Sequence, residues 1–330
     1  MAKLNLSIAI GDYDRVRPFV NGAVQMDGAD PTFMLLEPEE IFFRAFRHAE
    51  FDICELSLSS YALKTSQDDC PYVAVPVFPS RAFRHTSIYI RTDRGIDKPE
   101  DMKGKRIGVP EYQLTANVWA RMILETGYAV HPRDIHWMRG GYETPGRIEK
   151  IKISLPEDVQ IEAAPADATL SEMLADGRLD GLMGPRAPSC FERGDPNVGW
   201  LFKDPEQAAS DWYRKTKIFP IMHVLGIRRA LLEQHPFLAV AAVKAFTQSK
   251  AIALAKLGDT SATKVTLPFV EEQLKQARSL MGEDFWPYGV EPNRITLDTF
   301  LKAHHAQGLS SRLLTVDELF HPATLEGHKI

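Results

Sequence analysis

The sequence is poor in cysteine and carries no excess of positive charge. Its three cysteines, Cys54, Cys70 and Cys190, are odd in number and form no CxxC pair, so they provide no disulfide framework. Such cysteine usage is typical of a protein from a reducing cytoplasm. The formal net charge of −5 argues against a general nucleic-acid binder, although a local basic cluster can still recognise a small anion.

Long apolar segments are missing as well. No apolar run approaches the ~18 residues that a membrane-spanning helix needs. The apolar stretch 4–10 is short and charged residues follow at once, so the N-terminus lacks the features of a signal peptide. We therefore expect a cytoplasmic protein with neither a membrane nor a nucleic-acid partner.

Motifs for nucleotide binding, for serine hydrolases and for metal binding are also missing. No GxGxxG follows an expected strand, and no P-loop or GxSxG elbow occurs. His304 and His305 are consecutive on an expected helix and point in different directions. Four other histidines have no ligand-like spacing: His131, His136, His321 and His328. We predict no cofactor and no metal site, while a divalent metal held by distant residues is not excluded.

The sequence does contain an alternation of strand and helix patterns. Residues 4–10, 32–36 and 51–56 read as strands, and a helical pattern follows each of them. Because this order produces parallel strands, we expect a largely parallel sheet covered on both faces. A second series of the same kind starts at 106–109 and ends at 179–183.

A polar crossing at 97–104 separates the two series, and 219–227 reads as a strand that returns to the first. We therefore predict a two-lobed α/β fold, in which each lobe is a mostly parallel sheet flanked by helices. The first lobe is predicted to comprise 1–93 plus 217–330, and the inserted second lobe 94–216. Two crossings make a hinged cleft between the lobes, where we expect a small anionic ligand to bind.

Candidate site residues follow the expected strands, because open α/β sheets bind ligands at the carboxyl ends of their strands. Hydroxyls and free N–H groups at a helix start suit an anion, and arginine forks match carboxylates. These rules select Asp12, Arg15, Ser57, Ser59, Arg81, Arg84, His85, Tyr112, Thr115 and Arg186.

Most of these candidates have a plainer explanation. Arg81 and Arg84 would equally suit a solvated basic loop that pairs with the other lobe. Arg15 has acidic neighbours with which to pair, and a serine such as Ser57 is a common helix N-cap. Arg186 stands in a proline-rich turn, where an exposed arginine is ordinary.

Six segments resemble known proteins. Two of them, Lys105–Pro110 (KRIGVP) and Asp180–Gly184 (DGLMG), resemble the type II periplasmic-binding-protein-like fold. Four longer segments resemble the 4,5-dihydroxyphthalate decarboxylase family: IGDYDR at 10–15, ELSLSSY at 55–61, FPSRAFRH at 78–85 and FPIMH at 219–223. This second resemblance extends over nearly the whole chain. It implies conversion of 4,5-dihydroxyphthalate to protocatechuate and CO2 in the catabolism of phthalate.

The implied substrate sets the requirements of the site. Each of its two phenols is para to one of its two carboxylates, so loss of a phenolic proton pushes electron density to the ring carbon that bears that carboxylate. A general acid then protonates this carbon and CO2 leaves. Because the ring itself stores the charge, no electron-sink cofactor is needed in principle. We predict that four arginines bind the carboxylates: Arg15, Arg81, Arg84 and Arg186.

Two histidines are the candidate acid and base. The segment that contains His85 leaves the first lobe, and the segment that contains His223 returns to it. If these two segments lie side by side, both imidazoles reach one cleft. Asp12 is predicted to orient a histidine or to act as a base. The plainer explanation for His223 is a hydrogen-bonded core histidine.

Two other functions remain open at this point. A non-catalytic protein that binds or senses a small anion would have the same fold. A second enzyme class on this scaffold, such as a pyrimidine-precursor synthase or a small-acid lyase, is the other alternative. A synthase that consumes its own cofactor would be expected to contain a strong His/Cys cluster, which the sequence does not suggest. The sequence leaves open whether the chain forms a homo-oligomer.

Overall fold

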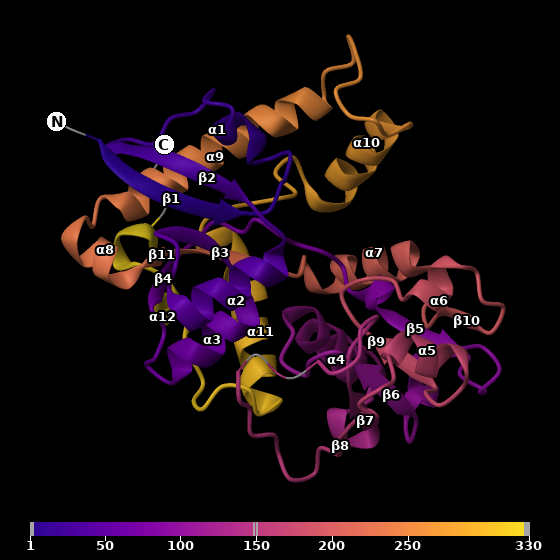
Figure 1. The fold of residues 1–330 in the computed structure, drawn as a ribbon. Coiled ribbons are helices and arrows are strands. Elements are labelled where there is room, and N and C mark those ends of the chain that lie inside the picture. The colour runs from indigo at the N-terminus through magenta and orange to yellow at the C-terminus, as the bar shows by residue number, and fades with distance from the viewer. Residues whose placement is uncertain (1–2, 148, 150, 327–330) are drawn as a thin grey trace. The chain divides into compact units, whose positions relative to one another are not determined.

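The computed structural model describes residues 3–147, 149 and 151–326, and it divides the chain into two compact units. Unit 1 comprises Met1–Arg81, Ile221–Asp298 and Leu314–Ile330, and unit 2 comprises Ala82–Pro220 and Thr299–Leu313. Each unit contains one mixed sheet with helices around it (Figure 1).

The sheet of unit 1 has the strand order β2-β1-β3-β11-β4. Strands β1 (Leu4–Ile10), β2 (Ala29–Leu35) and β3 (Ile53–Ser57) are mutually parallel, as their alternation with helices predicts. Strand β11 (His223–Arg228) lies antiparallel between β3 and β4 (Tyr72–Val75). The predicted return of the chain to the first sheet is therefore confirmed, and the returning strand makes the sheet mixed.

Helices of unit 1 pack on this sheet or on one another. They are α1 (Arg17–Val20), α2 (Pro38–His48), α3 (Leu58–Ser66), α8 (Arg229–Gln234), α9 (Leu238–Leu257), α10 (Val270–Met281) and α12 (Val316–Leu319). Side chains from the strands, such as Ile8, Ile10 and Leu225, pack with Phe19 of α1 and Phe246 of α9. All five are buried, so the apolar faces that the sequence pattern predicted do meet in one core.

Helix α9 is the one helix within the described part of the chain that is long and apolar enough to cross a membrane. Half of its most apolar window is buried inside the structure, and Leu238, Ala242 and Phe246 belong to the core of unit 1. Two of its lysines, Lys244 and Lys250, form ion pairs with Asp27 and Asp284. The apolar residues of α9 are therefore explained by packing in the core of unit 1.

The sheet of unit 2 has the order β10-β5-β9-β6-β7-β8. Strands β6 (Arg106–Val109), β7 (His136–Arg139), β8 (Ile161–Ala163) and β9 (Gly181–Met183) are parallel, while β5 (Ile88–Arg91) and β10 (Val198–Trp200) form the antiparallel end. The helices are α4 (Thr115–Tyr128), α5 (Leu170–Ala175), α6 (Ser189–Glu192) and α7 (Pro205–Thr216). Helix α11 (Arg294–Ala306) begins in unit 1 and ends in unit 2.

The boundaries between the units differ from the predicted crossings at 93/94 and 216/217. The structure divides the chain at 81/82 and 220/221, and it adds 299–313 to unit 2. The reason is strand β5, which pairs with β9 and β10 and therefore belongs to the second sheet. The two crossing segments do run side by side: Arg81 pairs with Ile221 in unit 1, and the Ala82 amide donates to the Pro220 carbonyl in unit 2.

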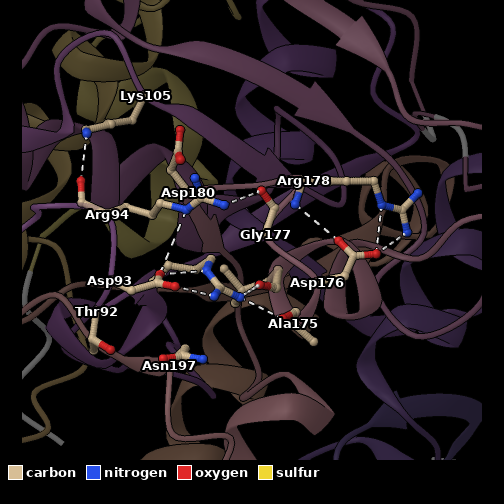
Figure 2. Close-up of polar contacts among 12 residues, drawn as sticks. Thr92, Asp93, Arg94, Lys105, Ala175, Asp176, Gly177, Arg178, Asp180 and Asn197 are labelled. Atoms are coloured by element: carbon tan, nitrogen blue, oxygen red, sulfur yellow. Dashed lines mark hydrogen bonds and ion pairs between the residues drawn. The ribbon is translucent and has the colours of Figure 1, made fainter.

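Polar contacts fasten the end of β5 to the loop after α5 (Figure 2). Arg91 donates to the carbonyls of Leu174 and Ala175, at 3.1 and 2.6 Å, where the last turn of α5 leaves carbonyls without helical partners. Figure 2 also shows Arg94 donating to the Gly177 carbonyl at 3.0 Å. Gly177 follows the end of α5 and has a φ of +83°, a left-handed conformation that glycine adopts without strain.

Candidate active site

A buried carboxylate at the carboxyl end of β3 organises the candidate site in unit 1. Glu55 is fully buried, although it carries a carboxyl group and lies between the apolar Cys54 and Leu56. Its carboxylate accepts hydrogen bonds from the Gly11 amide at 2.9 Å, the Tyr13 hydroxyl at 2.7 Å and Nδ1 of His223. Three donors from two other segments therefore converge on one acid.

Strand pairing sets the position of His223 beside Glu55. In the antiparallel β3–β11 pair, His223 lies opposite Ser57 and Leu225 lies opposite Glu55. Residues two apart on a strand share one face of the sheet, so His223 and Glu55 are diagonal neighbours on the same face. The ring of Phe42 in α2 contacts the imidazole edge to face, with 4.8 Å between centroids, and holds its orientation.

The electrostatics of this pair favour an ionised Glu55. Burial alone raises the pKa of this carboxyl group. The charge and hydrogen bond of His223, together with the bonds from Gly11 and Tyr13, outweigh burial and leave the pKa of Glu55 below its ordinary value. An ionised Glu55 accepts a hydrogen bond from Nδ1–H of His223, so Nε2 of the neutral ring is left as a proton acceptor.

Arg15 lies beside this pair and is held between two aromatic rings. Its guanidinium carbon is 4.2 Å from the centroid of Tyr13 and 4.4 Å from that of Trp286. Nε donates to the Pro79 carbonyl at 2.6 Å and Nη1 to Asp14 at 3.1 Å. With 16% of its side chain exposed, Arg15 is a fixed cation at the edge of the site.

The turn 286–289 supplies the second ring and is itself firmly held. Nε1 of Trp286 donates to the Phe78 carbonyl at 2.9 Å, and its carbonyl accepts from Lys250 at 2.7 Å. The hydroxyl of Tyr288 is buried without a hydrogen-bond partner in the described residues. Burial raises the pKa of Tyr288 and nearby Arg15 opposes the rise, so this phenol stays protonated.

Several residues predicted for the first lobe take structural roles. Asp12 is half exposed and pairs with Arg17, while Tyr13 rather than Asp12 contacts Glu55. Ser57 caps α3 by accepting from the Ser60 amide at 3.5 Å, as its plainer explanation proposed, and Ser59 is fully buried. The roles of Asp12, Ser57 and Ser59 in substrate binding or catalysis stay predictions.

Arg81 lies in unit 1 and is 6% exposed. It donates to the Pro287 carbonyl at 2.8 Å and to the side chain of Asn293, so it braces the turn that carries Trp286. A direct contact between Arg81 and a substrate carboxylate stays a prediction.

The remaining candidates belong to unit 2. Burial lowers the pKa of Arg84 to about 10, and its Nη1 contacts Ser87 at 3.4 Å and the Pro185 carbonyl at 3.5 Å. Thr115 is the first residue of α4 and is buried. Arg186 is exposed, and its carbonyl accepts a hydrogen bond from Tyr142. Their roles in binding stay predictions.

His85 lies in unit 2, in an aromatic environment. Its ring centroid is 4.9 Å from that of Phe202 and 6.0 Å from that of Trp212, and it is 1% exposed. Neither ring nitrogen has a partner in the described residues, and burial lowers the pKa of His85 to about 4. His85 is therefore a neutral imidazole near pH 7 and does not act there as an imidazolium acid. Its pairing with His223 of unit 1 stays a prediction.

Metal binding was tested on the donor set. No group of three or more His, Cys, Asp or Glu side chains that could hold a metal ion occurs within residues 3–147, 149 and 151–326.

Sequence reasoning missed Glu55, Tyr13, Trp286 and Tyr288 as members of the site. The signal for Glu55 was present, since a lone acid in the apolar strand ICELS needs a buried partner.

Comparison with known proteins identifies relatives along the whole chain. No family model matches the sequence. A 4,5-dihydroxyphthalate decarboxylase of Comamonas testosteroni is 64% identical over 330 residues, which is all of both chains. A second protein of that name, from Pseudomonas putida, is 66% identical over 214 residues, or 65% of this chain and 83% of its own length.

Solved structures with low sequence identity share the fold. A periplasmic sulfonate-binding protein from Methylobacillus flagellatus is 13% identical with a TM-score of 0.58, and covers 98% of this chain and 94% of its own. The aliphatic sulphonate-binding protein of Escherichia coli is also 13% identical, with a TM-score of 0.54 over 100% and 96%. The predicted periplasmic-binding-protein-like fold is thus confirmed, and by its full-length relative the chain belongs to the 4,5-dihydroxyphthalate decarboxylase family.

Proposed function

We propose that this protein decarboxylates 4,5-dihydroxyphthalate to protocatechuate and CO2, and that His223, oriented by Glu55, transfers the proton of a substrate phenol. The observation that carries the role of these residues is the hydrogen bond between Nδ1 of His223 and the fully buried Glu55. The identity of the substrate rests on the relative that matches the full chain.

The first step uses the free nitrogen of His223. Because Nδ1–H is donated to Glu55, Nε2 is the atom that accepts a phenolic proton, and Glu55 stabilises the imidazolium that forms. The electron pair of the phenolate moves into the ring and increases electron density at the para carbon. A proton from solvent reaches that carbon, its bond to the carboxylate breaks and CO2 leaves. As the ring regains its aromaticity, His223 returns its proton to the phenolate. The net reaction consumes one proton.

Arg15 is the cation of unit 1 that we assign to a substrate carboxylate. Its guanidinium is already fixed by Tyr13, Trp286 and the Pro79 carbonyl, so binding orders little that was free. The full-length relative is named for an aromatic dicarboxylate, 4,5-dihydroxyphthalate. A planar arginine fork suits a carboxylate group. Arg15 thus positions the substrate while His223 moves its proton.

The proposed function is tested by incubating chelator-treated protein with 4,5-dihydroxyphthalate and following protocatechuate and CO2. Equal amounts of both products from the untreated and the treated protein would support the proposal. They would also show that the reaction needs no readily removed metal. Turnover that returns only with a divalent ion would assign such an ion a role. Tight binding without either product, with or without added metal, would instead favour the non-catalytic binding protein.

A further inference from the structure

Buried polar atoms without partners are concentrated at one place in unit 2. Tyr112 Oη, Asn117 Oδ1 and Arg121 Nη1 have no hydrogen-bond partner in the described residues, and these residues are at most 1% exposed. The atoms Arg139 Nε and Glu149 Oε2 are also buried without a partner in the described residues, although the two residues themselves are partly exposed. Since folded proteins pair nearly all buried polar atoms, such a concentration points to a binding partner that the chain itself does not supply.

These atoms belong to one neighbourhood, at the carboxyl ends of β6 and β7 and the start of α4. The guanidinium of Arg121 lies 3.7 Å from the centroid of Tyr112, and its Nη2 donates to the Tyr112 carbonyl at 2.7 Å. Asn117 donates to the Glu111 carbonyl at 2.9 Å. The carboxyl ends of parallel strands are the edge at which α/β sheets bind ligands.

Glu149 enters this neighbourhood with its carboxyl group. Oε1 accepts from the Tyr112 amide at 2.6 Å, while Oε2 is buried without a partner. Burial raises the pKa of Glu149 to about 7; the Tyr112 amide, Arg139 and Arg121 lower it, and Glu111 raises it. A carboxyl group that uses one of its two oxygens beside two arginines is a poorly matched occupant.

The neighbouring ion pair uses Arg147 and Glu111, so Glu149 is not needed to neutralise Arg147. Arg147 bonds the fully buried Glu111 at 2.8 and 2.6 Å and so ties the same segment to the β6–α4 connection. With Glu111 neutralised by Arg147, the charges that face Glu149 are those of Arg121 and Arg139. The place therefore has an excess of positive charge that one well-seated anion would balance.

We propose that the Tyr112 amide, Arg121 and Arg139 form a carboxylate-binding site in unit 2, and that Glu149 occupies it until the carboxylate of an aromatic acid replaces it. Only the aromatic character of the ligand rests on the proposed function. Glu149 then acts as an internal competitor, which makes an unusual prediction: removing its charge strengthens ligand binding.

The test is equilibrium binding of phthalate, measured by calorimetry and by tryptophan fluorescence, because Trp137 packs 5.8 Å from Tyr112 between ring centroids. Phthalate has both carboxylates and lacks the phenols, so it binds without reacting. If Glu149 leaves the site open in roughly a tenth of the molecules, Glu149→Gln should tighten binding by roughly 10-fold. The matched control is Glu157→Gln, an exposed acid of the same segment, which should leave binding unchanged.

Arg139 provides the opposite arm of the experiment. Arg139→Gln should weaken phthalate binding in the Glu149→Gln background, and Arg139→Lys, which keeps the charge, should restore much of it. A folded Glu149→Gln protein that binds phthalate as weakly as the wild type, or more weakly, would overturn the proposed site even if decarboxylation is normal. If Glu149→Gln binds phthalate more tightly but neither this variant nor the wild type turns over 4,5-dihydroxyphthalate, the proposed function is overturned and the proposed site stands.

Discussion

Replacing Glu55 by glutamine should abolish most activity, because the carboxylate accepts three hydrogen bonds and an amide cannot accept all of them. The donors are Gly11, Tyr13 and His223, and Glu55 is fully buried. Glutamine presents one acceptor oxygen and an NH2 group that faces at least one of these donors. A buried donor left without its acceptor typically costs about 1–3 kcal/mol of stability. Loss of an oriented acid–base group typically lowers the rate by about 10²–10⁴-fold.

The assay for Glu55→Gln is the initial rate of CO2 release per folded molecule, with stability measured separately by denaturant unfolding. Asp52→Asn is the matched control, because Asp52 precedes the same strand and accepts from the amide and hydroxyl of Ser7 at 2.8 and 2.9 Å. It should lose stability and keep its rate per folded molecule. A folded Glu55→Gln protein with a rate within about threefold of the wild type would refute the reasoning.

Three further predictions concern single residues. Trp286→Leu removes one of the two rings that stack on Arg15 and should raise KM about 10-fold, the equivalent of a 1–2 kcal/mol contact. Trp286→Phe keeps a ring there and should retain most of the binding. Equal KM values for the wild type and Trp286→Leu would contradict this role. Gly11→Ala places a Cβ 2.5–2.7 Å from the Tyr13 ring and should lower kcat, so a normal kcat would speak against that packing. His85 has a folded-state pKa of about 4 against an ordinary 6.5, so wild-type stability should fall by about 3 kcal/mol as pH drops from 6.5 to 4. In His85→Leu, unfolding curves at both pH values should show a smaller loss, and an unchanged loss would disprove that assignment.

The fold was largely predictable because burial leaves a regular imprint on sequence. The first three strands and their helices follow from alternation alone, and the parallel β1–β2 and β1–β3 pairs confirm it. The position of β5 was not predictable in this way. Its four buried residues suit either sheet, and only pairing with β9 and β10 assigns it to unit 2.

The candidate site was predictable only in part. His223 was selected because its segment returns to the first sheet, and the structure places its ring against Glu55. Trp286 lies far along the chain from Arg15 and follows no strand, so no local pattern indicates that the two stack. Arg81 was selected from its place after a strand, and the sequence does not indicate that it also holds the turn after Trp286. Such roles depend on long-range packing, which a linear pattern does not encode.

The central claim is that His223 is the group that moves the substrate proton, and His223→Asn tests it most directly. Asparagine keeps a donor where Nδ1 contacts Glu55, so the buried carboxylate retains its partner, but it lacks the atom equivalent to Nε2. The measurement is CO2 release from 4,5-dihydroxyphthalate by the wild type and by this variant. We predict a rate about 10²–10⁴-fold lower with little change in phthalate binding. A variant that binds phthalate normally and releases CO2 at the wild-type rate would contradict the account.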